Sequence, residues 1–428
     1  MKLFLFVTLL LITTTGAMAQ IDKVINKAEV ERIEKILSAD DMEGRRTFTP
    51  GLERAGNFIA DEFKKSGLQL APGLNGYKQE FTMVQPRLIS ISGSFDQQPL
   101  TEKNIFVNTI ATELEVTHNS GFEKMKIKPG LNLMTEVANL ARTGKNYLVL
   151  VDTSYATLFG RLSGRGSRPV FKSSNSIVYV LSAADPKEYK ISVKQEVKEL
   201  RLANIVGMIP GKSKRDEYVI FSGHYDHLGI GRPVDGDSIF NGANDDAAGT
   251  TAVIMLANYF NTLHNNERTL VFAAFCGEEV GGYGAQHFSR QLAPEKVAAM
   301  FNIEMIGTDS KWGNNSAYIT GYEKTDMGKI LEKNLQGTGF TFYPDPYTEQ
   351  NLFYRSDNAT LARLGVPAHT ISTSKMDSEK YYHTVNDEIE TLDMENMAAI
   401  IRAVALSSQT IVSGKDTPSR VDTKQLTR

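Results

Sequence analysis

Histidines and carboxylates that could bind a metal recur along the second half of the chain, each just past a strand-like run or at a loop tip. They are His224, Asp245, the adjacent Glu278 and Glu279, Glu304 and His383. Zinc takes imidazole and carboxylate ligands, and two histidines with three carboxylates suit two zinc ions that share one bridging carboxylate. Consecutive side chains point apart on an extended backbone, so one of the adjacent glutamates could bind metal while the other faces the substrate as a general base.

Each of these residues, taken singly, has an ordinary structural explanation. A histidine after a strand is commonly a packed or surface residue, and a Glu-Glu pair is commonly a solvated charge cluster. Asp245 or Asp246 could simply cap the helix expected from Ala247. The ordered combination of all of them is what favours a metal site.

The elements that would position these residues follow a regular β/α alternation from Asn204 onward. Strands are expected at 218–223, 269–275, 298–305 and 368–372, and helices at 247–260, 284–290, 327–335, 358–364 and 394–411. Such alternation predicts an α/β fold, with a mixed, mostly parallel central sheet and helices on both faces. In open sheets of this kind ligands collect at the carboxyl ends of the strands.

The start of the chain has the pattern of a secretory signal peptide, 1–19. Lys2 supplies the positive region, residues 3–11 are apolar, and Ala17-Met18-Ala19 is a small-residue cleavage pattern. The apolar run is too short to span a bilayer comfortably. We therefore expect export to the periplasm or the extracellular space, without stable membrane insertion.

The remaining chain predicts one interrupted domain. Segments 20–85 and 199–412 would form it, and 86–198, where short strand-like pieces alternate with polar turns, would be an inserted domain or lid. The polar tail 413–428 is expected to be frayed. With 428 residues and a formal net charge of −3, the chain shows no basic excess that would favour nucleic acid. The single cysteine, Cys276, ends an apolar strand and is expected to be buried filler.

Five motifs occur in the order found in a known peptidase family. They are Ser222-Gly223-His224-Tyr225-Asp226, Asn241-Gly242-Ala243-Asn244-Asp245-Asp246-Ala247-Ala248-Gly249, Gly277-Glu278-Glu279, Asn302-Ile303-Glu304-Met305-Ile306-Gly307 and Tyr382-His383-Thr384. As an ordered set they resemble the aminopeptidase S / aminopeptidase Y family of co-catalytic di-zinc exopeptidases, whose relatives include the glutaminyl cyclases. The resemblance covers about residues 204–412 and extends weakly to 41–68. It implies the zinc-exopeptidase fold and two Zn²⁺ per chain.

The resemblance also implies a ligand set. His224 and Glu304 would bind one zinc, Glu279 and His383 would bind the other, and Asp245 would bridge them. The family usually has Asp where this chain has Glu304, whose longer side chain can still ligate. Many relatives carry a protease-associated insert where this chain has 86–198. The resemblance therefore suggests a protease-associated-like domain there, on the position of the segment alone.

Further roles follow from the same resemblance. Glu278 would be the general base for a metal-activated water, and Tyr382 would stabilise the oxyanion. Asp226 would orient the ligand His224, as carboxylates beside ligand histidines do. Arg355 would contact the substrate.

The sequence thus predicts an exported zinc-dependent aminopeptidase that removes N-terminal residues from peptides. Alternatives that keep the fold are a single-zinc, glutaminyl cyclase-like enzyme and a carboxypeptidase. The chain has neither G-x-S-x-G nor H-E-x-x-H, which excludes the usual nucleophile elbow and the zincin motif. A non-catalytic binding protein on a peptidase scaffold is disfavoured because Glu278 and all the candidate ligands are present.

Overall fold

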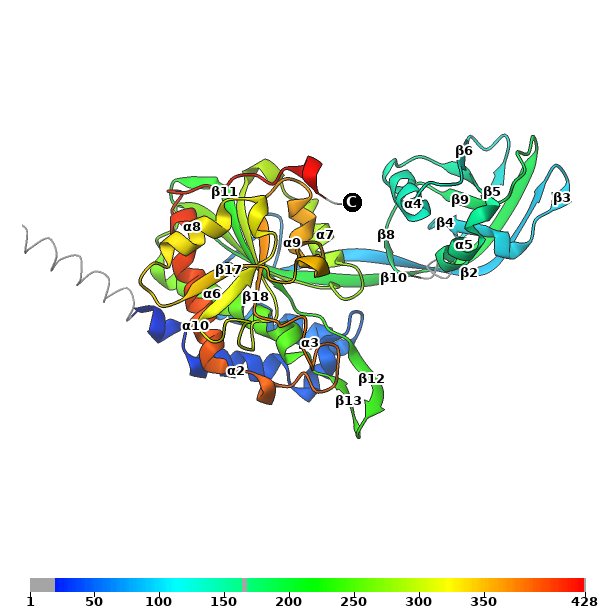
Figure 1. The fold of residues 1–428 in the computed structure, drawn as a ribbon. Helices are drawn as coiled ribbons and strands as arrows, with labels where there is room; N and C mark the ends of the chain where they lie inside the picture. Colours follow the sequence, from blue (N-terminus) through cyan, green and yellow to red (C-terminus); the bar gives the residue numbers. More distant parts are fainter. Residues whose placement is uncertain (1–19, 164–167, 427–428) are drawn as a thin grey trace, which may run out of the picture. The chain divides into compact units, whose positions relative to one another are not determined.

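The computed structural model describes residues 20–163 and 168–426, which form two compact units (Figure 1). The first unit comprises the described residues up to Glu80 together with those from Leu202 onward, and the second is Phe81–Arg201. The segment expected as an insert, 86–198, lies within the second unit. The predicted signal peptide, 1–19, lies outside the described residues.

The first unit is built on a mixed β-sheet whose strands follow the order β17-β16-β18-β15-β11-β14-β10. Their bounds are β10 (Tyr189–Ile209, shared with the second unit), β11 (Lys214–His224), β14 (Arg268–Phe275), β15 (Val297–Ile303), β16 (Ser316–Ile319), β17 (Thr341–Pro344) and β18 (Ala368–Ser372). The four strands β18, β15, β11 and β14 run parallel, whereas β10 is antiparallel to β14 and β16 is antiparallel to β18. The prediction of a mixed, mostly parallel sheet is confirmed.

Strand β11 lies in the middle of this sheet, and its apolar run is buried on both faces. Val219, Ile220 and Phe221 are fully buried. The Phe221 ring stacks on the rings of Phe272 and Phe301 from the neighbouring strands, at centroid distances of 5.5 and 5.0 Å. A continuous apolar strand of this kind is typical of a parallel sheet covered on both sides.

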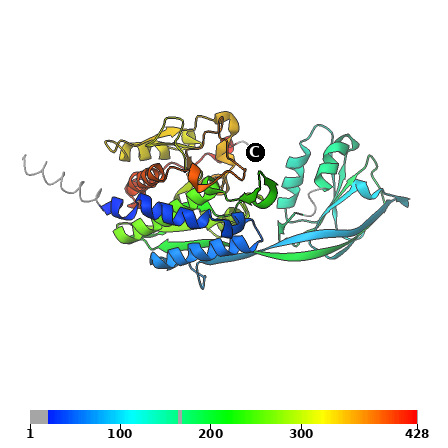
Figure 2. The ribbon, with the colours of Figure 1, turned by 90° about the horizontal axis from the view of Figure 1, so that it is seen from below.

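Helices cover both faces of the sheet, as predicted. They are α2 (Lys27–Leu37), α3 (Pro50–Lys65), α6 (Ala248–Leu263), α7 (Tyr283–Ser289), α8 (Met327–Asn334), α9 (Asn358–Ala362), α10 (Met394–Ser407) and α11 (Gln409–Val412). On one face α6 packs against β11, β14 and β15, with α2, α3 and α10 around it; Figure 2 shows α2 and α10 side by side. On the other face Phe288 of α7 and Leu361 of α9 pack against Ile220 and Val271. Two short strands, β12 (Gly229–Val234) and β13 (Asp237–Phe240), form a hairpin after β11.

The second unit has its own sheet and core. Its four-stranded sheet follows the order β4-β9-β7-β6, with bounds β4 (Ile105–Asn108), β6 (Glu123–Ile127), β7 (Tyr147–Val151) and β9 (Ile177–Leu181). The remaining elements are β2 (Lys78–Phe95, shared with the first unit), β3 (Gln98–Pro99), β5 (Glu113–Thr117), β8 (Val170–Phe171), α4 (Leu133–Arg142) and α5 (Ala156–Ser163). Apolar residues of β7 and β9 are buried on both faces, as in a sheet covered by helices on one side and strands on the other.

The tail from Ser413 is packed over its described part, so the expected fraying is wrong there. Val421 is only 4% exposed and belongs to the core cluster of the first unit. Arg420 donates hydrogen bonds to the carbonyl oxygens of Val297 and Pro294, and the buried Arg268 donates to that of Asp416. The polar composition suggested a solvated tail, but arginine–carbonyl hydrogen bonds hold it against the unit.

Cys276 is a buried free cysteine, as expected. None of the helices in the described ranges has the length and apolarity to cross a membrane.

Candidate metal centre

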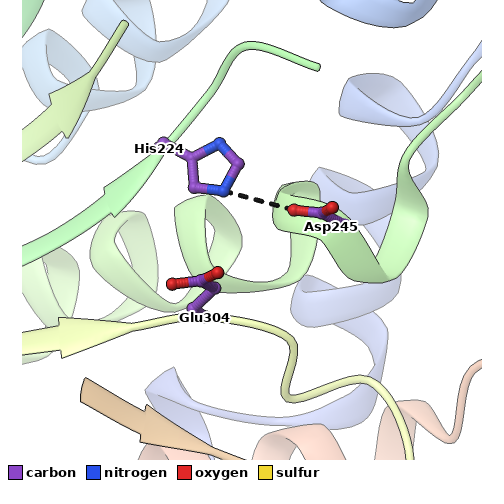
Figure 3. Close-up of side chains that lie close together, drawn as sticks. All are labelled: His224, Asp245 and Glu304. Carbon is purple, nitrogen blue, oxygen red and sulfur yellow. Dashed lines mark ion pairs between the residues drawn. The ribbon is translucent and has the colours of Figure 1, made fainter. Parts of the chain in front are cut away.

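The first group of candidate ligands forms where parallel strands end. His224 is the last residue of β11, Glu304 follows β15 directly, and Asp245 lies in the turn Ala243–Ala247 that leads into α6 (Figure 3). His224 Nε2 is 3.2 Å from Asp245 Oδ1. The three residues offer ligand atoms that all lie within 4.8 Å of one another. Neighbouring parallel strands end at the same edge of the sheet, which is why residues distant in sequence converge here.

A second group shares Asp245 with the first. His383 Nε2 lies 3.2 Å from Asp245 Oδ2 and 3.2 Å from Glu279 Oε2. The two oxygens of Asp245 therefore face different histidines, which is the arrangement a bridging carboxylate needs. His227 also reaches this group: its Nδ1 is 2.9 Å from Glu279 Oε1 and 3.7 Å from Asp245 Oδ2.

The chemistry of these side chains fits zinc. Several of their polar atoms are buried without a hydrogen-bond partner among the described residues, namely His224 Nε2, His227 Nε2, Asp245 Oδ2, Glu304 Oε2 and His383 Nε2. Buried polar groups are normally hydrogen-bonded, and exceptions commonly mark an ion or water. Imidazole nitrogens and carboxylate oxygens are the ligands that zinc prefers.

Protonation in the metal-free centre also suits metal binding. Burial lowers the pKa of His383, but the carboxylates of Asp245 and Glu279 outweigh it and raise that pKa to about 10. Burial raises the pKa of Asp245, and the neighbouring imidazoles of His224 and His383 outweigh it, so that this pKa lies well below its usual range. Protons on His224 and His383 thus balance the carboxylates, and a metal that binds would displace them.

Two further aspartates hold the ligand-bearing turn in place. Asp387 accepts hydrogen bonds from the backbone amides of Asn244 and Asp245, at 2.8 and 3.0 Å. Asp246 accepts from the amides of His224 and Met305, at 3.1 Å each. Asp246 thereby ties the end of β11 to the residue that follows Glu304, so the spacing of the first group is fixed by backbone contacts.

The N-terminal segment contributes a buried arginine to the same framework. The guanidinium of Arg45 donates to the carbonyl oxygens of Leu37, Tyr225, Asn241 and Gly242, at 2.5 to 2.9 Å. Two of these carbonyls belong to the turn before Asp245, and Tyr225 follows His224. Arg45 therefore joins the two loops that carry the histidine and the bridging aspartate, which gives the 41–68 segment a role in positioning the ligands.

The contacts of Asp226 differ in part from the expected orientation of His224. The carboxylate of Asp226 accepts from the backbone amides of Glu278 and Glu279, at 3.1 and 3.4 Å. His224 Nδ1 lies 3.1 Å from the backbone carbonyl of Asp226 and 3.8 Å from its carboxylate. The side chain of Asp226 thus fixes the glutamate pair, and its backbone orients the histidine.

A pocket opens beside the two groups and contains the remaining predicted site residues. It is lined by Asp245, Glu278, Glu279, Glu304, Met305, Tyr318, Thr320, Leu352, Arg355, Ser356, Thr370, Ser372, Ser374, Met376 and Tyr382. The Tyr382 ring stacks on that of His383, with centroids 3.8 Å apart. Burial raises the pKa of Glu278 well above its usual range, and the carboxylates of Glu304 and Asp357 add to this effect while His224 opposes it. A bound cation would lower that pKa again.

No role in the site was predicted for His227, Asp387 or Arg45. His227 stands three residues after His224 in the run His-Tyr-Asp-His, and this spacing is a signal that could have marked it as a second histidine of the same loop. Asp387 and Arg45 bind backbone groups, and such contacts leave no residue pattern in the sequence.

The part of the chain that carries the candidate ligands is similar to known peptidases. Residues 204–407 match the family described as "Peptidase family M28". A "Probable zinc metalloprotease" of Pyrenophora tritici-repentis is 36% identical over 110 residues, which is 25% of this chain and 25% of that protein. "Leucine aminopeptidase 1" of Penicillium rubens is 31% identical over 216 residues, covering 45% of this chain and 52% of that protein. The chain thus spans about half or less of the length of these relatives.

Among solved structures, the aminopeptidase from Aneurinibacillus sp. strain AM-1 superposes with a TM-score of 0.55 at 17% identity, covering 95% of this chain and 98% of that one. At this identity the likeness establishes the fold. The part of the chain that carries every candidate ligand, residues 204–407, is the part that matches Peptidase family M28.

Proposed function

We propose that the protein is an exported, zinc-dependent aminopeptidase that hydrolyses N-terminal residues of peptides and holds two zinc ions per chain. The observation that carries the proposal is Asp245, whose two carboxylate oxygens each face a different histidine, His224 and His383, at 3.2 Å. The M28 match and the aminopeptidase relatives support the reaction class. Export rests on the signal-like pattern at 1–19.

The chain's own residues supply the proton movements. Zinc, when bound, acts as a Lewis acid that polarises a carbonyl group and lowers the pKa of water. Glu278, held by the Asp226 carboxylate through its backbone amide, would take a proton from the attacking water and pass it to the leaving amine. Burial, with the nearby carboxylates of Asp245 and Glu279, raises the pKa of Tyr382. Its hydroxyl therefore keeps its proton and can donate a hydrogen bond to the developing oxyanion.

The charges around the pocket support cleavage at the amino terminus. Asp245, Glu278, Glu279 and Glu304 line it, and Arg355 is the basic residue among the described lining residues. A terminal carboxylate would be bound by cationic side chains, of which Arg355 is the one among the described lining residues, and the aminopeptidase relatives support the amino-terminal direction. We assign to the exposed Arg355 a hydrogen bond to the peptide beyond the scissile bond.

The alternatives differ in metal count and in the substrate end. A glutaminyl cyclase-like enzyme needs one zinc, and the presence of a complete second group of ligands around Glu279 and His383 speaks against it. A carboxypeptidase of the same fold would use the same two groups but would bind a terminal carboxylate.

The test is a mass-spectrometric digest of defined peptides by the zinc-loaded protein. Peptides with free and with acetylated amino termini are compared, each with and without a chelator, and a Glu278→Gln variant serves as the matched control. We expect stepwise loss of residues from free amino termini alone, abolished by the chelator and by the variant. Loss from carboxyl termini would overturn the direction, and loss of ammonia from N-terminal glutamine without shortening would identify a cyclase.

A further inference from the structure

His227 is buried beside the second group of ligands. It is 1% exposed, and its backbone amide donates to the carbonyl oxygen of Arg45 at 3.2 Å. Its ring lies against Gly242, where an added Cβ would come within 2.5 Å of the ring atoms Cγ and Cδ2. Only a glycine allows the ring this close to the turn that carries Asp245. The backbone and the turn together fix where the imidazole points.

The imidazole of His227 points at two carboxylates that the proposed function already assigns to zinc. Nδ1 lies 2.9 Å from Glu279 Oε1 and 3.7 Å from Asp245 Oδ2, and the rings of His227 and His383 are 5.7 Å apart. Carboxylate oxygens of both Glu279 and Asp245 thus lie within 3.7 Å of the same imidazole nitrogen, as the ligands of one metal ion do.

We propose that His227 is a fourth protein ligand of the second zinc ion, binding through Nδ1 beside His383, Asp245 and Glu279. This inference rests on the proposed function, because it deepens the description of the same centre. Zinc binds nitrogen and oxygen at about 2.0 to 2.2 Å, and the ligands of a tetrahedron of that size lie roughly 3.4 Å apart. The two histidines lie 2.9 and 3.2 Å from the two oxygens of Glu279 and 3.7 and 3.2 Å from Asp245 Oδ2, separations that lie around that value.

The fourth ligand makes the two halves of the centre unequal. The first group offers three residues, His224, Asp245 and Glu304, and the second offers four. Zinc sites with three protein ligands keep a position for water or substrate, whereas sites with four protein ligands are those that hold the metal structurally. The second position should therefore bind zinc more tightly and retain it when the first is emptied.

The experiment measures zinc binding itself and needs no substrate. Wild-type protein, His227→Asn and His227→Ala are dialysed against buffers of fixed free zinc, and bound zinc is counted by elemental analysis. Asparagine places an amide nitrogen near the position of Nδ1, so it can still donate to Glu279, but it is a poor zinc ligand. Replacing the exposed His264 by alanine is the matched control, and thermal melts check that each variant is folded.

The expected result is that wild-type protein fills two sites of different affinity. In His227→Asn the tighter site should weaken by more than about 100-fold, beyond the 10- to 100-fold typical of groups that only orient a ligand. A smaller change in His227→Asn would overturn the proposal and leave His227 as a hydrogen-bond donor to Glu279.

A second measurement keeps the proposal testable if the variants fail to fold. X-ray absorption of the wild-type protein with two zinc ions should report three imidazoles for the pair, and two imidazoles would contradict the proposal. Zinc binding with these properties but without peptide hydrolysis would refute the proposed function alone. Hydrolysis with a three-ligand second site would refute only the role of His227.

Discussion

The two units of the protein bury different kinds of side chain. In the described residues of the second unit the buried polar side chains are uncharged, namely Thr109, Asn175, Ser176 and Gln195. The first unit buries many ionisable groups, among them Glu34, Arg45, His224, Asp226, His227, Asp245, Asp246, Asp357 and Asp387. Burying charge is costly unless it is paired, hydrogen-bonded or bound to a metal. The difference indicates that the first unit carries the chemistry and that the second is stabilised by apolar packing.

The largest effect should come from the base in the first unit. Glu278→Gln removes the group that moves the proton but leaves both ligand groups intact. We expect the rate of peptide hydrolysis to fall by about 10²- to 10⁴-fold, the usual contribution of general acid–base catalysis. Steady-state assays with elemental analysis on the same sample measure both properties. Unchanged turnover, or a fall explained by lost zinc, would contradict the role of Glu278 as the general base.

Removal of metal should destabilise the first unit and leave the stability of the second unit unchanged. Without cations the carboxylates of Asp245, Glu279 and Glu304 face one another. A ligand present at about 1,000 times its dissociation constant stabilises the folded state by roughly 4 kcal/mol, and a chelator should remove that stabilisation. Hydrogen exchange followed by mass spectrometry should show faster exchange around 224–246 and 278–304. Equal loss of protection in β7 and β9 of the second unit would contradict the view that the metal stabilises the first unit alone.

Glu34 should give the first unit a distinctive pH dependence. Burial raises its pKa to about 8, although Thr251 and Arg45 oppose the shift. The folded state therefore keeps a proton that the unfolded state, with an ordinary pKa of about 4.3, has lost. The stability from this group is complete below about pH 4.3 and is lost as the pH rises to about 8, with a slope of roughly 1.4 kcal/mol per unit.

Urea unfolding of metal-free wild-type protein and of Glu34→Gln between pH 5 and 8 measures this dependence. As the pH rises, the free energy of unfolding of the wild type should fall steadily relative to that of Glu34→Gln. A difference that stays constant over this range would show that Glu34 is already ionised at pH 5.

The smallest effect should come from the ion pairs of the second unit. Lys190 and Glu115 lie 3.4 Å apart with side chains 61% and 67% exposed. Exposed pairs contribute little, because the surrounding water screens them. Glu115→Ala should change the free energy of unfolding by less than about 0.5 kcal/mol. A loss above about 1 kcal/mol in urea melts would show that surface charge matters more in this unit than its burial pattern suggests.

Sequence periodicity predicted the centre of the first unit because its strands are buried on both faces. The apolar runs of β11, β14 and β18 are continuous and end close to the expected positions. The 21-residue strand β10 was not predicted, since exposed charged residues such as Lys198 and Glu199 interrupt its pattern. The β12–β13 hairpin was also missed, because Pro233 and several glycines there are typical of a loop.

The candidate site was predictable where a ligand follows a strand. His224, Glu304 and the Glu278-Glu279 pair all stand just after an apolar run, and the sheet then brings them to one edge. The place of His227 depends on how closely the turn at Gly242 approaches it, and local sequence does not encode that approach. The anchoring of the Asp245 turn by Asp387 depends on a contact across more than 140 residues, so periodicity could not indicate it.

The most direct test of the account is anomalous diffraction at the zinc edge from crystals of the zinc-loaded protein. The account predicts two peaks in the first unit that share Asp245. One should lie among His224, Asp245 and Glu304, and the other among His227, His383, Asp245 and Glu279. A single peak, or two peaks that do not share Asp245, would contradict the two-zinc centre on which the proposed aminopeptidase rests.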